Sequence, residues 1–292
     1  MQICKLDFQN SLGLSCIENY VIACIKKYSC FYPLAFYKSH LSAKRIFELI
    51  YTNNIEYAFF SGIPRIQDLC LQHRAIVGTF KEDVLPLKKI DLIEHLLCIQ
   101  VRPQFTKDYF HNNVWRNDHY VLIQKNGDGK LTLINDSPLF ELQVDYDFIA
   151  RIYAGRYFLF SPCAKVQFDE NDCLFELLQS MSVEKVNEGI SFSESISLKD
   201  ILKIRDFVGV LRILRKRIEL ILSCYIDTKC LRNSVAEMDR LYSTMEYYRL
   251  RKKWENNIVK QCVLTTIYED TKQIAKLRKQ LEDYLCAKKY KS

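Results

Sequence analysis

The sequence predicts an α+β fold in which helices pack on an antiparallel sheet, followed by a bundle of long helices. Three observations favour this class: an amphipathic helix near the N-terminus, two apolar runs on either side of a glycine-rich turn, and a C-terminal third without proline. The 292 residues are 49% hydrophobic and 26% charged, which is typical of a globular protein.

The first helix is expected over residues 15–29, where apolar residues recur every three or four positions. Ser15 followed by Glu18 fits a capping box. This assignment puts Cys16 at the first helical position, where backbone N–H groups and the helix dipole lower the pKa of a thiol. A second helix is expected over residues 41–52.

A β-hairpin over residues 119–136 is the clearest strand signal, because two apolar runs flank the segment 126–129 (NGDG). A loop centred on that segment pairs positions whose numbers sum to 255 and places His119 opposite Asp136. Their Cβ atoms would then lie about 5 Å apart. A carboxylate at that spacing orients an imidazole and supports its charged form, whereas a one-residue slip would separate the pair.

Further strands are expected near 76–80, 96–101 and 156–160, with a short helix near 145–154. The chain is therefore predicted to have three parts. Residues 1–165 form a catalytic core, 166–198 a connecting segment and 199–292 a basic helical region. This last part carries 22 Lys/Arg against 12 Asp/Glu.

A cysteine at a helix start, with His and Asp on adjacent strands downstream, is the papain-type arrangement. We therefore predict a papain-like core with Cys16 as nucleophile, His119 as general base and Asp136 as orienting acid. The twelve cysteines contain no CxxC pair and no Cys/His cluster with zinc spacing, so neither a metal site nor a disulfide framework is expected.

Three motifs resemble those of a known family: GLSCIEN at 13–19, NDHYVLI at 117–123 and LINDSP at 133–138. They resemble papain-like proteins of bacterial biosynthetic clusters, in particular the butirosin biosynthesis protein H N-terminal-like family and, more distantly, the bacteriocin-leader peptidases. The resemblance covers about residues 9–160. It implies transfer of an acyl or peptidyl chain from a carrier-protein thioester to an amine, or its release by cyclisation, in specialised-metabolite biosynthesis.

The resemblance also bears on the oxyanion hole. Papain-like enzymes usually place a glutamine six residues before the cysteine, and here Asn10 holds that position while Gln9 lies seven before. Either side chain is a candidate donor beside the Cys16 backbone N–H. Ile17 follows the cysteine where the leader peptidases typically carry glycine, which weighs against a protease.

The basic C-terminal region has three interpretations: a solvated helical face, a nucleic-acid surface or a docking surface for an acidic partner. No nucleic-acid motif appears, and docking of an acidic carrier protein with its phosphopantetheine arm fits the enzyme hypothesis without any other cofactor. The candidate docking residues are Arg212, Arg215, Lys216, Arg217, Arg249, Arg251, Lys252 and Lys253. Whether this region also forms a homodimer stays open.

Two alternatives remain at this level. One is a cysteine peptidase or amidase with the same triad, and the other is a non-catalytic helical interaction protein. The N-terminal segment does not resemble a signal peptide, and no stretch approaches the roughly 18 uncharged apolar residues of a membrane span. We therefore expect a cytoplasmic protein without a membrane span.

Overall fold

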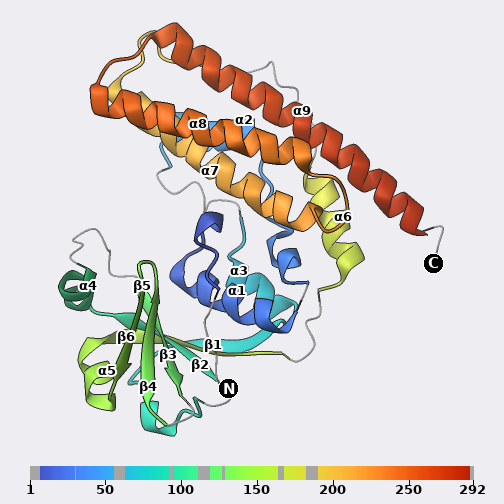
Figure 1. Cartoon of the computed structure of the whole chain (residues 1–292). Helices are drawn as coiled ribbons and strands as arrows, with labels where there is room; N and C mark the ends of the chain where they lie inside the picture. The colour runs from blue at the N-terminus through green and yellow to red at the C-terminus, as the bar shows by residue number, and fades with distance from the viewer. Residues whose placement is uncertain are drawn as a thin grey trace. The chain divides into compact units, whose positions relative to one another are not determined.

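The structure is a computed structural model of the whole chain and describes residues 7–29, 31–55, 63–92, 95–110, 119–126, 129–163, 168–181 and 190–289. The chain forms two compact units (Figure 1). Unit 1 comprises Met1–Tyr32 and Arg65–Phe168, and unit 2 comprises Pro33–Pro64 and Asp169–Ser292. The predicted α+β class is confirmed.

Unit 1 is built on a six-stranded antiparallel sheet with the strand order β1-β6-β2-β3-β4-β5. The strands are β1 (Ile76–Glu82), β2 (Leu96–Val101), β3 (Tyr120–Lys125), β4 (Leu131–Asp136), β5 (Leu139–Val144) and β6 (Tyr153–Pro162). Strand β5 was not predicted. None of its side chains is fully buried, so its apolar residues give a weak strand signal at this edge of the sheet.

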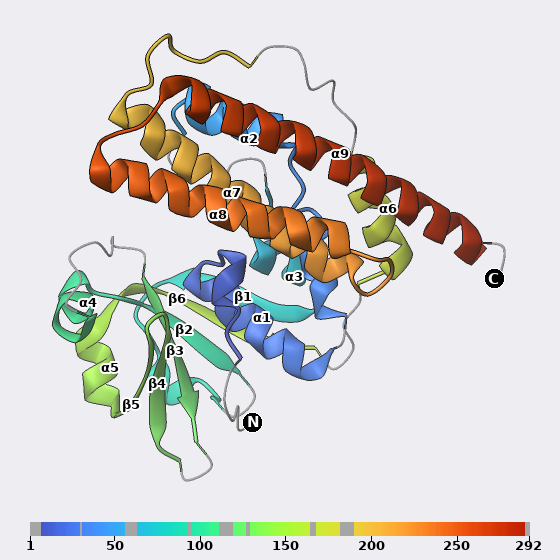
Figure 2. The same cartoon turned by 45° about the horizontal axis from the view of Figure 1, so that its top comes forward.

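Helices lie on both faces of this sheet. They are α1 (Cys16–Tyr28), α3 (Ile66–Gln72), α4 (Pro103–Phe110) and α5 (Tyr146–Ile152), with single 3₁₀ turns η1 (Asn10–Leu12) and η5 (Leu87–Lys89). Helix α1 contacts β3, β4 and β6, and α3 contacts β1. Phe105 of α4 and Ile149 of α5 pack with Val121, Ile123 and Leu133 in a separate core on the sheet. Helices α4 and α5 can be followed in Figure 2.

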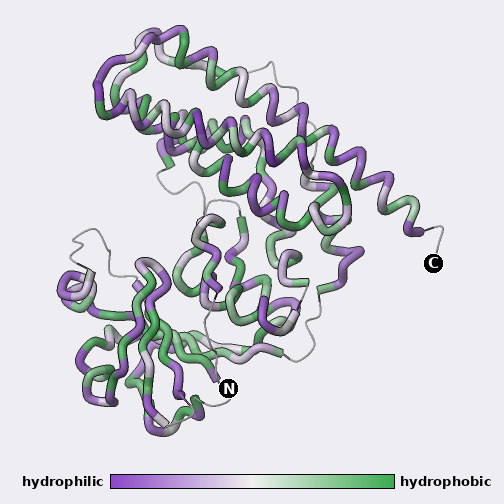
Figure 3. Tube along the Cα trace, viewed as in Figure 1, coloured by the Kyte–Doolittle hydropathy of each residue, from purple (hydrophilic) through white to green (hydrophobic). Residues whose placement is uncertain are grey.

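Unit 2 is helical. Its elements are η2 (Tyr32–Phe36), α2 (Ala43–Phe47), the π-helical η3 (Glu48–Thr52), α6 (Glu170–Ser180), α7 (Leu198–Leu222), α8 (Lys229–Arg251) and α9 (Asn256–Lys289). Hydrophobic and hydrophilic residues alternate along the long helices (Figure 3). The apolar positions of α2, η3, α7, α8 and α9 form one core. Long helices without proline were predicted here.

The division into units differs from the one expected from sequence. Residues 33–64 belong to unit 2 because α2 and η3 pack against α7, although they lie between two segments of unit 1. The expected connecting segment 166–198 contains α6, and its residues 182–189 lie outside the described part of the chain.

The hairpin is present, but its predicted register is wrong by one residue. Lys125 pairs with Leu131 and Leu122 with Ile134, so paired positions sum to 256. The Asn126 N–H donates to the Lys130 carbonyl at 2.8 Å, and Gly129 adopts φ 82°. Residues 126–130, with a left-handed glycine, therefore lie between the last paired positions, in place of the four-residue loop 126–129 that we expected. Gly127 and Asp128 lie outside the described residues.

Two of the predicted docking residues are buried, which corrects their assignment to a surface. Arg215 is fully buried and donates through Nε and Nη2 to the Asp270 carboxylate, each at 2.7 Å. Arg217 is 1% exposed, and its guanidinium lies 5.4 Å from the centre of the Phe36 ring. These cations stabilise the interior of unit 2 and are not available to a partner.

His40 is buried, at 7% exposure, and we expect it to make the stability of unit 2 sensitive to acid. Burial, reinforced by neighbouring Arg215, lowers the pKa of His40 to about 3, and the backbone of Ser180 offsets only part of this effect. A depressed imidazole pKa means that the unfolded chain binds the proton more readily below pH 6.5. We expect the free energy of unfolding to fall by roughly 2–3 kcal/mol between pH 6.5 and 4.5 from this group alone.

Urea titrations of the wild type and His40→Phe at pH 7 and pH 4.5 test this expectation. The phenyl ring keeps the apolar bulk and removes the titration, so the variant should lose less stability on acidification. Equal losses in both proteins would assign the acid sensitivity to other groups.

Candidate active site

Helix α1 begins as predicted. Ser15 is the N-cap, its hydroxyl accepts the Glu18 N–H at 3.4 Å, and the Glu18 carboxylate accepts the Ser15 N–H at 2.9 Å. Cys16 is therefore the first residue of the helix, and its side chain is half-buried. The same Glu18 carboxylate also accepts the Ile66 N–H at 2.8 Å and ties the start of α1 to the start of α3.

The Cys16 sulfur contacts the backbone of β3, where the Tyr120 N–H donates to Sγ at 3.4 Å. Hydrogen bonds from the N–H groups of Tyr120, Ile17 and Cys16 lower the pKa of this thiol. Burial and the Asp136 carboxylate have the larger, opposite effect and raise the pKa to about 12. The expectation of a lowered pKa at the helix start is therefore wrong, because desolvation exceeds the effect of the three N–H groups.

His119 immediately precedes β3, and its ring contacts Asn135. His119 Nε2 lies 2.6 Å from Asn135 Oδ1, while Asn135 Nδ2 donates to the Pro138 carbonyl at 2.7 Å. An amide oxygen only accepts, so Nε2 carries the proton and Nδ1 is the basic nitrogen of the neutral ring. Burial lowers the pKa of His119, whereas Asn135 and Asp136 raise it.

The orienting partner of His119 is thus Asn135, which corrects the predicted role of Asp136. The one-residue change of register is the cause: continued along the two strands, it puts Asp136 opposite Tyr120 and Asn135 opposite Val121, on the same face as His119. Sequence reasoning missed Asn135 because an asparagine next to an aspartate at a strand end resembles a turn. A His–Asn pair orders an imidazole as a His–Asp pair does, without a second charge.

Asp136 still lies at the site, held there by α1. Asn19 Nδ2 donates to the Asp136 carboxylate at 2.9 Å, and Asn19 Oδ1 accepts the Gln9 N–H at 3.0 Å. Asn19 is 2% exposed and lies one helical turn after Cys16. This spacing was the available sequence signal for a residue on the same helix face. The Asp136 carboxylate raises the pKa of both Cys16 and His119.

The backbone of the sheet also fixes α1. The Tyr20 hydroxyl donates to the Ile134 carbonyl at 3.1 Å and lies 3.2 Å from that of Tyr120. Tyr20 is fully buried. Because these carbonyls belong to β3 and β4, this one side chain fixes the helix that carries the thiol against the strand that follows His119 and the strand that contains Asn135.

Of the two candidates for the oxyanion hole, Gln9 is the one whose side chain is described. The Gln9 side-chain amide donates to the Asp7 carbonyl at 3.5 Å, and Gln9 precedes η1. The side chain of Asn10 lies outside the described residues.

The six remaining candidate docking residues are exposed or half-buried. Arg212 and Lys216 form ion pairs with Asp239, and Arg249 pairs with Glu246. The Arg251 guanidinium lies 5.7 Å from the centre of the Tyr247 ring. Lys252 and Lys253 follow α8 and are exposed.

The comparisons with known proteins found no match: no family model and no curated protein is similar to this chain. Ten cysteines in the described part of the chain are free thiols. The described residues contain no group of three or more His, Cys, Asp or Glu suited to a metal ion. Among them, no helix is both long and apolar enough to cross a membrane.

Proposed function

We propose that this protein is a cysteine-nucleophile acyl-transfer enzyme with a papain-like core and a Cys16–His119–Asn135 triad. Two hydrogen bonds support the proposal: the Cys16 sulfur at the helix start accepts the N–H of Tyr120, the residue that directly follows His119, and the His119 ring donates to Asn135. A nucleophile, a base and a group that orients the base are the parts that such catalysis needs.

The proposed reaction has two stages. His119 takes the Cys16 proton as sulfur attacks the carbonyl carbon of a thioester, and the leaving thiol takes that proton as the carbon–sulfur bond breaks. The acyl group is then bound to Cys16. An amine attacks this acyl carbon, gives its proton to His119, and releases the Cys16 sulfur, which takes the proton back. An amine of the tethered chain itself gives a cyclised product, and water gives hydrolysis.

Thiol and imidazole are both neutral before substrate binds, because the pKa of Cys16 is raised and that of His119 is lowered. We therefore expect acylation by a thioester to fall as pH drops through the His119 pKa, below 6.5, and to level off above it. Alkylation of Cys16 by iodoacetamide needs the thiolate and should keep rising, about tenfold per pH unit, towards a pKa of about 12. Both reactions are quenched at fixed times and followed by mass spectrometry, which measures the two rates as functions of pH.

Intact-protein mass spectrometry with simple acyl thioesters of N-acetylcysteamine tests the function itself. The expected result is a single acyl adduct per chain, mapped by peptide mass to Cys16 and cleared by an added amine. Cys24 provides an internal control, since it is buried in the same helix and burial also raises its pKa to about 12. Adducts spread over several cysteines, or none at all, would contradict the proposal.

We further propose that an acidic carrier protein presents the donor. Reversal of the exposed cations in Lys252→Glu/Lys253→Glu should lower the acylation rate with a carrier-bound donor about tenfold at low salt, because opposite charges steer the encounter. The rate with an N-acetylcysteamine thioester should not change. An unchanged rate with the carrier at low salt would assign docking to another surface.

A further inference from the structure

Asn19 places a buried amide between two parts of the candidate active site. It lies one helical turn after Cys16 on α1 and is 2% exposed. Its Oδ1 accepts the Gln9 N–H at 3.0 Å, and its Nδ2 donates to the Asp136 carboxylate at 2.9 Å. The amide therefore joins the segment before η1 to the end of β4, through the helix that carries the thiol.

The bond to Gln9 closes a short loop in front of Cys16. The Gln9 carbonyl accepts the Leu12 N–H at 3.0 Å, and Gly13 has a left-handed conformation with φ 59°. Both backbone groups of Gln9 are thus held, the N–H by Asn19 and the carbonyl by Leu12. This loop contains the two candidates for the oxyanion hole.

The bond to Asp136 acts on charge. The Asp136 side chain is buried, at 5% exposure, and a hydrogen bond donated to a buried carboxylate favours its charged form. Burial lowers the pKa of His119, whereas Asn135 and the Asp136 carboxylate raise it. The carboxylate therefore supports the imidazolium that forms when His119 takes the proton of Cys16.

These two bonds need an amide at position 19. The same side chain accepts an N–H at one atom and donates to a carboxylate at another. Leucine has a similar shape and makes neither bond. Aspartic acid makes both only while it is protonated, because its carbonyl oxygen can then accept the Gln9 N–H while its hydroxyl donates to Asp136.

We propose that Asn19 is a positioning residue of the acyl-transfer site, and that its amide holds the oxyanion-hole segment and the Asp136 carboxylate in place around Cys16. The inference rests on the proposed acyl-transfer function. Asn19 acts through these groups and not on the substrate. Its loss should therefore lower kcat and kcat/KM equally and leave KM nearly unchanged.

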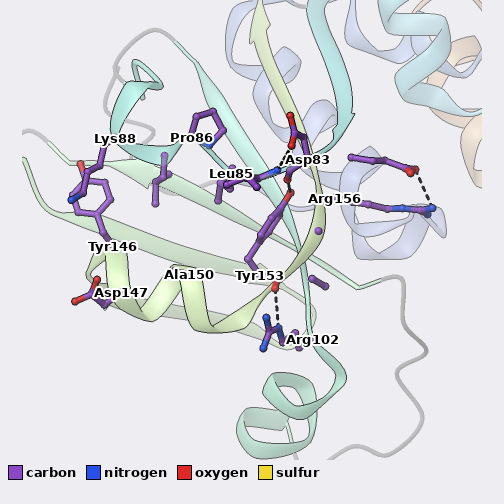
Figure 4. Close-up of a pocket in the computed structure, with 15 residues that line it drawn as sticks. Asp83, Leu85, Pro86, Lys88, Arg102, Tyr146, Asp147, Ala150, Tyr153 and Arg156 are labelled. Carbon is purple, nitrogen blue, oxygen red and sulfur yellow. Dashed lines mark hydrogen bonds and ion pairs between the residues drawn. The ribbon is translucent and has the colours of Figure 1, made fainter.

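A matched control is available in another part of unit 1. A pocket of about 1010 Å³ is lined by residues that follow β1, by α5 and by the start of β6 (Figure 4). Neither Gln9, Asn19 nor Asp136 lines it. Ala150 of α5 lines this pocket and is exposed, so Ala150→Asp adds a solvated carboxylate to unit 1 outside the surroundings of Asn19.

The pH range of the test follows from the groups around Asp136. Its carboxylate raises the pKa of Cys16 and Tyr20 on α1, of Cys98 on β2 and of His119. Burial is the larger effect on Cys16, Tyr20 and Cys98 and raises the pKa of each, so they stay neutral up to about pH 9. A fall in rate between pH 6.5 and pH 9 would therefore report a newly introduced carboxyl group.

Asn19→Asp introduces that group. Two adjacent buried carboxyl groups share one proton, and their repulsion raises the upper pKa of the pair well above that of a single carboxyl. With an N-acetylcysteamine thioester, we expect kcat at pH 6.5 within about threefold of the wild type, because the shared proton restores both bonds. At pH 9, where the wild-type rate has levelled off, kcat should be lower by about tenfold or more.

Two further variants complete this comparison. Asn19→Leu should lose about 10²-fold in kcat at both pH values, and Ala150→Asp should keep the wild-type profile. Circular dichroism at each pH verifies that the variants are folded. A ratio of Asn19→Asp to wild-type kcat that does not change with pH would overturn the positioning role, and so would a folded Asn19→Asp that is inactive at both pH values.

Alkylation of Cys16 by iodoacetamide gives a second readout that needs no acyl transfer. Above the upper pKa of the pair, the added charge raises the pKa of the thiol, so Asn19→Asp should be alkylated several-fold more slowly than Ala150→Asp at pH 9. Equal rates there would also overturn the inference, because no charge would have been added beside the sulfur. A wild-type protein that forms no acyl adduct is a different failure, which removes the proposed function and the role of Asn19 with it.

Discussion

Cys16→Ala is expected to abolish the acyl adduct and to lower thioester turnover by about 10⁴-fold or more, equivalent to roughly 5 kcal/mol of transition-state stabilisation. Among the described thiols, Cys16 is the one whose sulfur accepts the N–H of the residue that follows His119. Alanine fits the same space, and the capping box of Ser15 and Glu18 does not involve the side chain at position 16. The folded protein should therefore persist, as far-UV circular dichroism would verify.

Three neighbouring substitutions assign the other roles. His119→Gln should cost about 10²–10⁴-fold in the acylation rate. Asn135→Ala should cost about 10²-fold because the ring loses its orientation. Asp136→Asn keeps the shape that Asn19 holds and should cost less, while moving the acid limb of the pH profile to lower pH because a carboxylate that raises the His119 pKa is gone. A larger loss for Asp136→Asn than for Asn135→Ala would restore the aspartate as the triad member.

Asp270→Asn is expected to destabilise unit 2 by about 3–5 kcal/mol, because it leaves the Arg215 cation buried without its counter-charge. Both side chains are almost completely inaccessible, at 0% and 1% exposure. Arg215 also donates to the Leu41 carbonyl at 2.9 Å, so the pair joins α7 and α9 to the inserted segment 33–64. Urea unfolding followed by helical circular dichroism measures the loss.

Arg212 offers a matched control one turn earlier on α7. Its ion pair with Asp239 has the same 2.7 Å length, but the side chains are 25% and 44% exposed. Asp239→Asn should change the stability by less than about 1 kcal/mol. The double variant Arg215→Met/Asp270→Leu should recover most of the loss. Equal effects of Asp239→Asn and Asp270→Asn would show that burial does not set the strength of these pairs.

Patterns within one element were predictable from sequence, and pairings between elements were less so. The capping box fixed the start of α1 because Ser15 and Glu18 are local partners. The hairpin was recognised, yet its loop, with a left-handed glycine at position 129, is one residue longer than expected. In the resulting register Asn135, not Asp136, lies on the face of His119 and contacts its ring. The spacing of residues around Cys16 in the sequence does not predict the desolvation that raises its pKa, because the groups around the sulfur include Tyr120 and Asp136 from distant segments.

The same distinction explains the basic residues. Arg212, Arg215, Lys216 and Arg217 look alike as a charge cluster, and only the packing of α7 against α9 and residues 39–41 separates the buried cations from the exposed ones. The membership of 33–64 in unit 2 was likewise hidden, since its partners lie more than 100 residues further along the chain.

Unit 2 is formed by two separate segments of the chain, and this has a consequence for synthesis on the ribosome. The apolar face of α2, with Ile46 and Phe47, emerges long before α7–α9 exist to cover it. At about 5–20 residues per second, the delay lasts roughly ten to forty seconds. During that interval the nascent chain presents a hydrophobic segment between the parts of unit 1, which makes it a natural client for a holding chaperone. A chain that stops at Phe168 never leaves that state.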